Sequence, residues 1–171
     1  ALKDAGYRTS FIGKWHLGHN EKYWPEHQGF DENIGGGRWP GPPSYFSPYK
    51  ISNLPDGPEG EYIADRLTDE ALRFLDEAQD GPFFLNFWQY AVHAPYQGKV
   101  EYREHFEEKR DPRGAQHNAV MGAMIKSLDD SVGRIMDKHF PDRLELYNLA
   151  ADPGEVNNLA EDQPAIAGEM E

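Results

Sequence analysis

The sequence predicts an α/β fold in which a partial parallel sheet is flanked by helices. Three features support this: an apolar run at Phe83–Trp88, an amphipathic pattern before and after it, and a short segment with strand composition near the N-terminus. A continuous apolar run of strand length is typical of a strand buried on both faces, and such strands are usually parallel and covered by helices. Strand, helix, strand and helix in succession is the sequence signature of this class.

The first elements have recognisable boundaries. Residues 1–5 are expected to form the last turn of a helix, with Gly6 as its left-handed cap. Residues 7–12 carry the aromatic and β-branched side chains of a short strand, which ends at Gly13. Residues 29–60 are crowded with Gly and Pro, which predicts a long excursion over the surface. Such long loops are usually functional or disordered.

Two amphipathic helices and a small C-terminal element complete the prediction. Residues 62–79 place apolar side chains at helical spacing, with charged residues between them, and Pro82 follows the end of that pattern. Residues 116–137 show the same spacing and are expected to form the second helix. Residues 144–148 alternate as a short strand of a separate, small antiparallel element, and the acidic tail after it is expected to be poorly ordered.

Composition excludes some classes of function. The 171 residues carry 17 Lys and Arg against 30 Asp and Glu, a net charge of −13, which argues against a nucleic-acid-binding protein. A few convergent cations in a pocket can still hold an anion, because the local field outweighs distant screened charges. The absence of cysteine removes disulfides, thiolate metal sites and cysteine nucleophiles. No apolar run reaches the length of a membrane helix, so we expect no membrane span.

The first candidate site follows the N-terminal strand. Lys14 and His16 lie between Gly13 and Gly18, directly beyond the carboxyl end of that strand. Ligands of open α/β sheets bind outside the carboxyl ends of strands, and the glycines let the backbone approach a ligand. If the extended geometry continues, Lys14 and His16 face one side and Trp15 the other. Residue types alone leave a second interpretation open, in which both polar side chains are simply solvated.

The second candidate is His93, which lies just past the expected buried strand. Pro95 follows it and restricts the turn. An imidazole beyond a central parallel strand is well placed for chemistry, because histidine exchanges protons near neutral pH. The alternative is a loop histidine whose ring hydrogen-bonds the backbone.

The remaining acidic and imidazole clusters favour no metal site. Asp129 and Asp130 are neighbours on a predicted helix and point about 100° apart, so they cannot chelate one ion together. A solvated acidic face accounts for them better. His27, His105 and His117 show no metal-ligand spacing with one another, and we interpret them as surface residues.

A longer motif around the first candidate site resembles a known family. The second signature of the formylglycine-dependent sulfatases, within the alkaline phosphatase superfamily, is closely similar to Gly6-Tyr7-Arg8-Thr9-Ser10-Phe11-Ile12-Gly13-Lys14-Trp15-His16. Weaker similarities to that family follow in the same order, at residues 27–31, at residues 83–95 with their His-Ala-Pro turn, and at residues 144–160. Because the order also agrees, coincidence is a poor explanation, and the resemblance covers nearly the whole chain.

The resemblance implies a sulfuric ester hydrolase with an alkaline-phosphatase-like fold, acting on sulfate esters, with sulfated carbohydrates or other sulfated small molecules as substrates. In that family a formylglycine hydrate attacks sulfur and a calcium ion polarises the sulfate. By position, Lys14 would neutralise charge on the sulfate and on the formylglycine oxygen. His16 would bind the formylglycine hydroxyl and help to eliminate sulfate, and His93 would face the sulfate and the leaving oxygen. The resemblance also implies a periplasmic, secreted or otherwise extracytoplasmic location.

The chain departs from the family pattern in ways that matter for activity. No serine is followed by Pro at the second and Arg at the fourth position, and no cysteine exists, so the nucleophile motif is absent. The calcium ligands of the family would lie upstream of Ala1 and after residues 116–137. We therefore expect residues 1–138 to be a partial catalytic domain and residues 139–171 to be a remnant of the C-terminal subdomain. By itself, the chain is expected to be inactive.

Two other functions stay open at this point. One is a phosphatase or phosphonate hydrolase of the same superfamily, which would differ in its nucleophile. The other is a non-catalytic anion- or glycan-binding fragment. The Gly- and Pro-rich excursion contains aromatic residues that could support glycan binding, because their rings suit either stacking on sugars or packing within the loop. These residues are Trp39, Tyr45, Phe46 and Tyr49. If the two strands are neighbours, Lys14, His16 and His93 should converge on one site, because adjacent strands lie about 4.8 Å apart.

Overall fold

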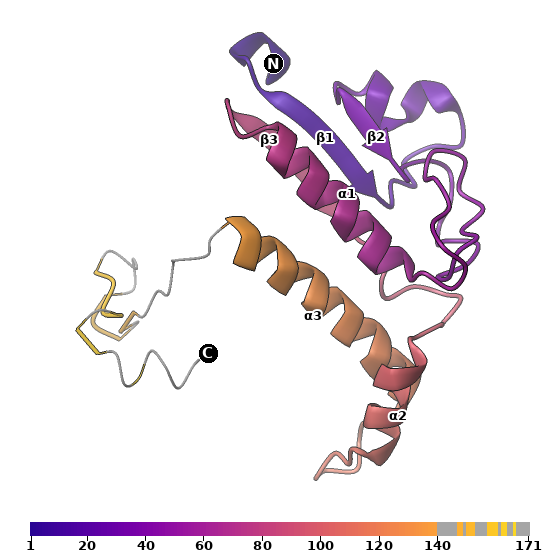
Figure 1. The fold of residues 1–171 in the computed structure, drawn as a ribbon, viewed down its shortest axis with the longest axis vertical. Helices are drawn as coiled ribbons and strands as arrows, with labels where there is room; N and C mark the ends of the chain where they lie inside the picture. Colours follow the sequence, from indigo (N-terminus) through magenta and orange to yellow (C-terminus); the bar gives the residue numbers. More distant parts are fainter. Residues whose placement is uncertain (140–146, 149, 153–156, 161, 164–165, 167–171) are drawn as a thin grey trace. The chain divides into compact units, whose positions relative to one another are not determined.

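The structure is a computed structural model that describes residues 1–139, 147–148, 150–152, 157–160, 162–163 and 166 (Figure 1). It divides into two compact units, Ala1–Ile135 and Met136–Glu171. The main strands and helices are β1 (Arg8–Gly13), β2 (Glu32–Ile34), α1 (Ile63–Glu77), β3 (Phe83–Trp88), α2 (Val100–Glu108) and α3 (Ala119–His139). The strand predicted at residues 144–148 falls mostly outside the described residues.

The sheet is parallel, with β1 at its centre and the order β2-β1-β3. β1 pairs with β3 from Arg8 opposite Phe83 to Gly13 opposite Trp88, so the prediction of two neighbouring parallel strands is confirmed. Figure 1 shows α1 running alongside these strands. The α/β class and the two predicted long helices are confirmed as well, and the predicted N-terminal turn is a short 3-10 helix that ends at Gly6 with a φ of 82°.

Strand β2 was not predicted, because its three residues lie in a stretch dominated by Gly and Pro. Its position depends on side-chain bonds to β1 as much as on the ladder. The Asp31 carboxylate accepts hydrogen bonds from the Thr9 amide and hydroxyl at 2.9 Å each, and the Ser10 hydroxyl donates to Glu32 at 2.9 Å. These contacts place Glu32–Ile34 beside β1, a pairing that no local propensity would indicate.

The prediction that residues 29–60 form a surface excursion is wrong. Tyr45 and Tyr49 are fully buried, and Ile51 and Leu54 are nearly so. These side chains belong to the main core cluster together with residues of α1. The reason is that a tyrosine ring can fill a core when its hydroxyl finds a partner: the Tyr49 hydroxyl donates to Glu61 at 2.7 Å. Burial, together with that carboxylate, raises the pKa of the Tyr49 phenol.

The core lies on the α1 face of the sheet. Ile12 of β1 is fully buried against Leu67, Ala71 and Phe74 of α1. Leu85 of β3 packs against the same cluster, since it lies opposite Ser10 and therefore shares a face with it and with Ile12. Packing of this apolar stripe explains why the helical pattern at residues 62–79 is correctly predicted from the sequence.

The other face of the sheet carries a cluster of aromatic rings. Phe11 is fully buried there and contacts Trp15, Phe30 and Trp88 edge-on, with ring centroids 4.9, 5.6 and 5.3 Å away. Trp88 is nevertheless 43% exposed and Phe84 is 37% exposed. The prediction that β3 is buried on both faces is therefore wrong for the described residues, because β3 lies at the edge of their sheet and only its α1 side reaches the core.

Helices α2 and α3 are joined through Asp130. Its carboxylate accepts a hydrogen bond from the Tyr102 hydroxyl at 2.6 Å and pairs with Lys126. Burial by itself would raise the pKa of Asp130, but the hydrogen bonds from Lys126 and Tyr102 hold it below its usual range. Asp129 is 75% exposed, as the acidic-face interpretation requires, whereas Asp130 is a structural partner and not a solvated one. No helix among the described residues is both long and apolar enough to cross a membrane.

The exposed aromatic face predicts low stability and aggregation of the isolated chain. We expect the purified 171-residue chain to be marginally stable and to aggregate, because edge strands with exposed rings favour association. Phe84→Lys should raise the monomer fraction in size-exclusion chromatography. Leu17→Lys is the control, since Leu17 is 60% exposed and lies outside the sheet. A cooperative melt at high temperature from a monomeric wild-type chain would contradict this expectation.

The ion pair at Asp130 predicts a pH-dependent stability. Because the folded pKa of Asp130 is depressed, its contribution is present above the ordinary Asp pKa of about 3.9 and is lost as the pH falls through the folded value. Asp130→Asn should lower the free energy of unfolding by about 1 kcal/mol at neutral pH, and the difference should vanish in strong acid. Urea titrations along a pH series measure this, and Asp129→Asn should show no such trend.

Candidate functional site

Lys14 and His16 continue directly from the central strand. The Lys14 amide donates to the Trp88 carbonyl at 2.7 Å, which extends the β1–β3 ladder by one residue. The His16 amide then donates to the Gly37 carbonyl at 2.9 Å, so the loop crosses to the segment after β2. Gly13 has a φ of 112°, and a Cβ there would lie 1.8 Å from the Trp88 oxygen. Only glycine therefore permits this close approach.

The extended geometry stops at Gly13, so strand alternation does not decide where Lys14 and His16 point. His16 has a φ of 53°, a left-handed conformation that costs a non-glycine residue about 1 kcal/mol or more. Lys14 is half-buried and His16 is exposed. Strain at a polar residue of a candidate site is typical of positions where the surrounding structure holds a functional geometry.

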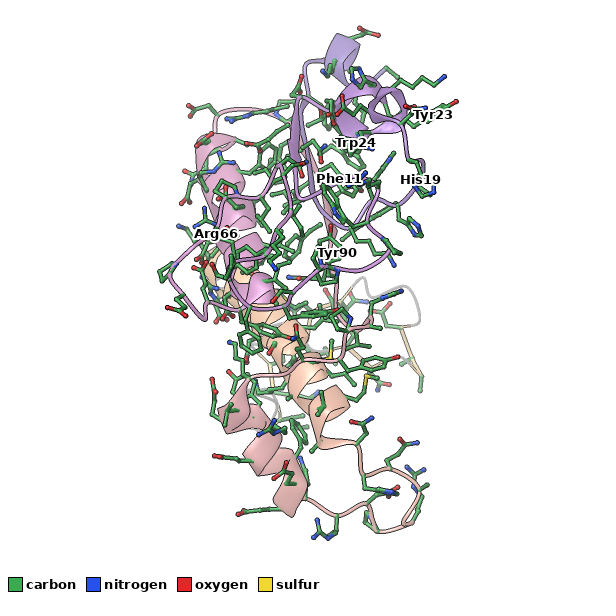
Figure 2. All side chains as sticks on the ribbon, turned by 90° about the vertical axis from the view of Figure 1, so that its right-hand side faces the viewer. Phe11, His19, Tyr23, Trp24, Arg66 and Tyr90 are labelled. Atoms are coloured by element: carbon green, nitrogen blue, oxygen red, sulfur yellow. The ribbon has the colours of Figure 1, made fainter. Side chains whose placement is uncertain are left out.

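Trp15 anchors this loop, a role that the sequence pattern did not reveal. Its indole N–H donates to the Tyr23 carbonyl at 2.8 Å, and its ring stacks on Trp88 with centroids 6.0 Å apart. Figure 2 shows Tyr23 and Trp24 in the same upper part of the view as Phe11 of β1. The loop after His16 thus folds back onto the strand that precedes Lys14.

His93 lies in the turn after β3 and is held by a buried tyrosine. The Tyr45 hydroxyl accepts a hydrogen bond from the His93 amide at 3.0 Å, and its own proton is shared between the carbonyls of Tyr90 at 2.8 Å and His93 at 2.9 Å. The ring Nδ1 of His93 lies 2.9 Å from the Ala94 carbonyl. Since a carbonyl only accepts, this contact assigns a proton to Nδ1 and leaves Nε2 for a ligand.

The segment 35–41 contacts both candidate loops. Its Gly37 carbonyl binds the His16 amide, and its Gly35 carbonyl accepts from the Tyr90 hydroxyl at 2.7 Å. Gly41 lies against His93, because a Cβ at Gly41 would come within 2.6 Å of the His93 Nδ1. The loops after β1 and β3 are therefore supported by one short glycine-rich segment. Sequence reasoning missed this support, and the glycine run was its only signal.

Three cations at this end of the sheet have no acidic partner among the described residues. Lys14, Lys22 and Arg38 form no ion pair with a carboxylate in the part of the chain that the structure describes. Arg73, by contrast, pairs with three glutamates, at 2.5, 2.9 and 2.9 Å. Cations that are not neutralised in an acidic protein favour an anionic ligand.

The described residues do not fit a metal site. No group of three or more His, Cys, Asp or Glu side chains among them is placed to hold an ion, so no calcium-dependent step is derived from them. The three histidines interpreted as surface residues, His27, His105 and His117, are all exposed. The sequence also lacks the Cys or Ser motif from which formylglycine is formed.

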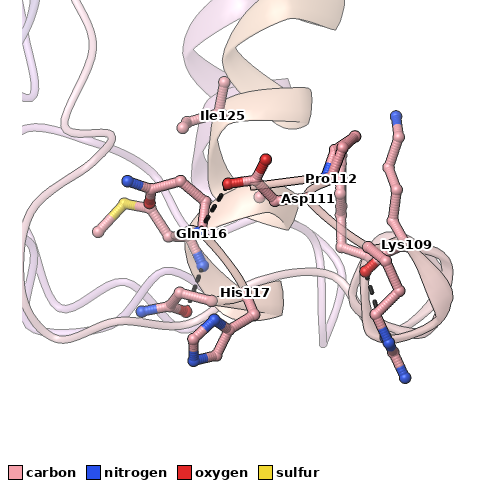
Figure 3. Close-up of a pocket in the computed structure, with 11 residues that line it drawn as sticks. Lys109, Asp111, Pro112, Gln116, His117 and Ile125 are labelled. Atoms are coloured by element: carbon pink, nitrogen blue, oxygen red, sulfur yellow. Dashed lines mark hydrogen bonds between the residues drawn. The ribbon is translucent and has the colours of Figure 1, made fainter. Parts of the chain in front are cut away.

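A separate groove of about 450 Å³ lies between α2 and the start of α3 (Figure 3). Phe106 and Ile125 line it, together with the loop 109–118. The Asp111 carboxylate stabilises that loop by accepting from the amides of Ala115 and Gln116 at 3.0 Å each. None of the three candidate site residues lines this groove.

Comparison with known proteins relates the chain to sulfatases. The family model described as Sulfatase matches residues 1–139. The N-acetylgalactosamine-6-sulfatases of Mus musculus and Homo sapiens are both 31% identical to it over 159 residues. These matches cover 79% and 80% of this chain but only 28% and 27% of the relatives. The uncharacterized sulfatase YdeN of Escherichia coli (strain K12) is 30% identical, over 80% of this chain and 28% of its own length. The chain thus spans less than a third of the length of these relatives.

Solved structures agree with this relation. The crystal structure of Ps i-CgsB in complex with k-i-k-neocarrahexaose matches 80% of this chain and 34% of that one, with a TM-score of 0.62 and 26% identity. The structure of the putative sulfatase yidJ from Bacteroides fragilis has a TM-score of 0.57 at 22% identity, over 80% of this chain and 38% of that one, and so supports the fold alone.

The hydrogen bonds of Tyr45 predict a specific local effect. Tyr45→Phe would leave the His93 amide and two carbonyls without their partner inside the fold, which costs about 1–3 kcal/mol. We expect faster hydrogen exchange in the peptide that covers residues 89–95, measured by mass spectrometry. Tyr96→Phe is the matched control, because Tyr96 lies on the same loop and is 58% exposed. Equal exchange in the two variants would contradict the anchoring role.

Proposed function

Since the chain belongs to the sulfatase family, we propose that residues 1–138 form part of the catalytic domain of an enzyme that hydrolyses sulfate esters of carbohydrates. One observation carries the proposal. Lys14 and His16 follow β1 and His93 follows β3, its parallel neighbour, and the segment 35–41 contacts both loops. Ligands of α/β sheets bind at this end of the strands.

The three side chains have distinct roles in the proposed reaction. Lys14 is half-buried, and its ammonium neutralises charge that develops on the transferred sulfate, as preorganised cations do in a site that excludes water. His93, with its Nδ1 proton directed at Ala94, presents Nε2 to the sulfate and, when doubly protonated, donates to the leaving oxygen. His16 binds the hydroxyl of the nucleophile. The nucleophile and the calcium ligands come from outside the described residues.

The names of the similar proteins point to sulfated sugars as substrates. One group of relatives is named for N-acetylgalactosamine 6-sulfate, and one structural neighbour is a complex with a carrageenan hexasaccharide. We propose a sulfated glycan or small sulfated saccharide as the partner of this site. The family resemblance also leads us to propose that the enzyme acts outside the cytoplasm.

The proposal predicts no turnover by the 171-residue chain alone, because its sequence offers no formylglycine motif. Incubation with 4-nitrophenyl sulfate and with N-acetylgalactosamine 6-sulfate, followed by measurement of released sulfate, tests this. Release of sulfate above the uncatalysed rate would contradict the conclusion that these 171 residues lack the nucleophile. Release of phosphate from a phosphate monoester by the extended enzyme, with no release of sulfate, would favour the phosphatase alternative.

The site assignment is tested in a chain extended to the length of its relatives and bearing the formylglycine. Lys14→Ala, His16→Ala and His93→Ala should each lower kcat/KM by about a hundredfold or more, as the loss of a partner of the transition-state charge does. His27→Ala and His105→Ala are controls, since both residues are exposed and lie outside the candidate loops. Turnover near the wild-type level after any of the three site substitutions would remove that residue from the site.

A further inference from the structure

A polar pocket of about 700 Å³ adjoins the loop that carries Lys14 and His16. One wall comes from the loop after His16 and the other from the segment after β2. The residues that matter for its chemistry are His19, Glu21, Lys22, Trp24, Arg38 and Trp39. Figure 2 shows His19, which lines the first wall, on the same side of the view as Tyr23. Nothing in the proposed cleavage chemistry uses these side chains.

Both walls are tied to the candidate site by hydrogen bonds. The His16 amide donates to Gly37, the residue directly before Arg38, at 2.9 Å. The Trp15 indole donates to Tyr23, the residue directly after Lys22, at 2.8 Å. The pocket is therefore formed by segments that are bonded to the loop that would hold the sulfate, so it lies next to the proposed cleavage site.

The charge of the pocket favours an anion. Lys22 and Arg38 form no ion pair with a carboxylate among the described residues, although the chain as a whole has a net charge of −13. Among the described residues, Glu21 is the one acidic residue that lines the pocket. With His19 on the same wall, basic side chains outnumber acidic ones. An arginine that no carboxylate neutralises suits a planar or tetrahedral oxyanion, because its guanidinium offers parallel donors.

The pocket also offers aromatic surface. The rings of Trp24 and Trp39 lie 6.1 Å apart at an angle of 37°, and the Arg38 guanidinium lies 5.9 Å from the centre of the Trp39 ring. Trp39 and Trp24 are half-buried, so part of each ring reaches solvent. Apolar ring faces beside a few fixed polar groups are typical of sites that bind organic ligands. Neutral glycans would use the rings alone, whereas the cations require an anionic group.

We propose that this pocket binds a second anionic group, a sulfate or a carboxylate, on the sugar next to the one whose sulfate ester is cleaved. This inference rests on the proposed function, and it adds a selection for polyanionic oligosaccharides over singly sulfated sugars. Arg38 is the main determinant, with Lys22 in support and Trp39 as the stacking surface.

Binding to the 171-residue chain tests the pocket without any need for turnover. Isothermal titration with a carrageenan tetrasaccharide, whose anionic groups are all sulfates, should show binding that Arg38→Gln weakens by about tenfold, as loss of a charged hydrogen bond does. Arg38→Lys should recover part of it. Arg110→Gln is the matched control, since Arg110 is exposed and likewise lacks a described carboxylate partner. Circular dichroism confirms that each variant keeps the wild-type fold.

Two further ligands show whether the pocket binds a sulfate or a carboxylate. A hyaluronan tetrasaccharide carries carboxylates only, and a chitin tetrasaccharide carries no charge. Loss of affinity on Arg38→Gln for carrageenan alone assigns a sulfate, and loss for both anionic ligands assigns an oxyanion of either kind. Equal binding of all three ligands, no effect of Arg38→Gln, or no binding of either anionic ligand to the wild-type chain would overturn the proposal.

Kinetics in the extended enzyme distinguish this proposal from the proposed function. Arg38→Gln should raise KM about tenfold for a sulfated tetrasaccharide, leave kcat nearly unchanged, and have no effect on 4-nitrophenyl sulfate. Lys14→Ala should slow the hydrolysis of both substrates. An Arg38→Gln enzyme with unchanged KM for the tetrasaccharide would reject the pocket while the cleavage site stands. Full activity of Lys14→Ala would reject the cleavage site instead.

Discussion

Parallel pairing between β1 and β3 positions the whole candidate site. Because Gly13 lies opposite Trp88, the loops that follow the two strands leave the sheet at the same level. The contact is so close that a side chain at Gly13 would overlap the Trp88 carbonyl, and the ladder continues through the Lys14 amide. A shift of register by one residue would turn the alternating faces of either strand over, so the aromatic face and the α1 face depend on the same pairing.

Two buried tyrosines hold the turn that carries His93 in place next to the sheet. The Tyr45 hydroxyl holds the backbone of His93, and the Tyr90 hydroxyl holds Gly35 on the other side. Burial raises the pKa of both phenols, which keeps them neutral and able to donate. The turn that carries His93 would otherwise be free to move, and three hydrogen bonds to the one buried Tyr45 hydroxyl fix it at a low entropic cost because the ring is already packed.

Charge is distributed unevenly in this acidic chain. Most of its basic side chains pair with carboxylates, on the helices above all, and so contribute little net field. Other basic side chains have no described carboxylate partner, and among these Lys14, Lys22 and Arg38 follow the strands β1 and β2. An anion-binding region can therefore exist in a protein with a net charge of −13, because unpaired cations at short range dominate the local potential.

The sequence by itself determined the α/β class, the two long helices, the parallel neighbours β1 and β3, and the family, because periodicity and a contiguous motif are local signals. It could not reveal β2, the burial of Tyr45, or the half-exposed state of Trp88. These depend on partners far along the chain: Asp31 on Thr9, Tyr45 on His93, and Trp88 on its place at the edge of the described sheet. The sequence identified Lys14 and His93 as candidates, and only the tertiary structure showed that one glycine-rich segment supports both loops, because hydrogen bonds between distant residues leave no periodic pattern.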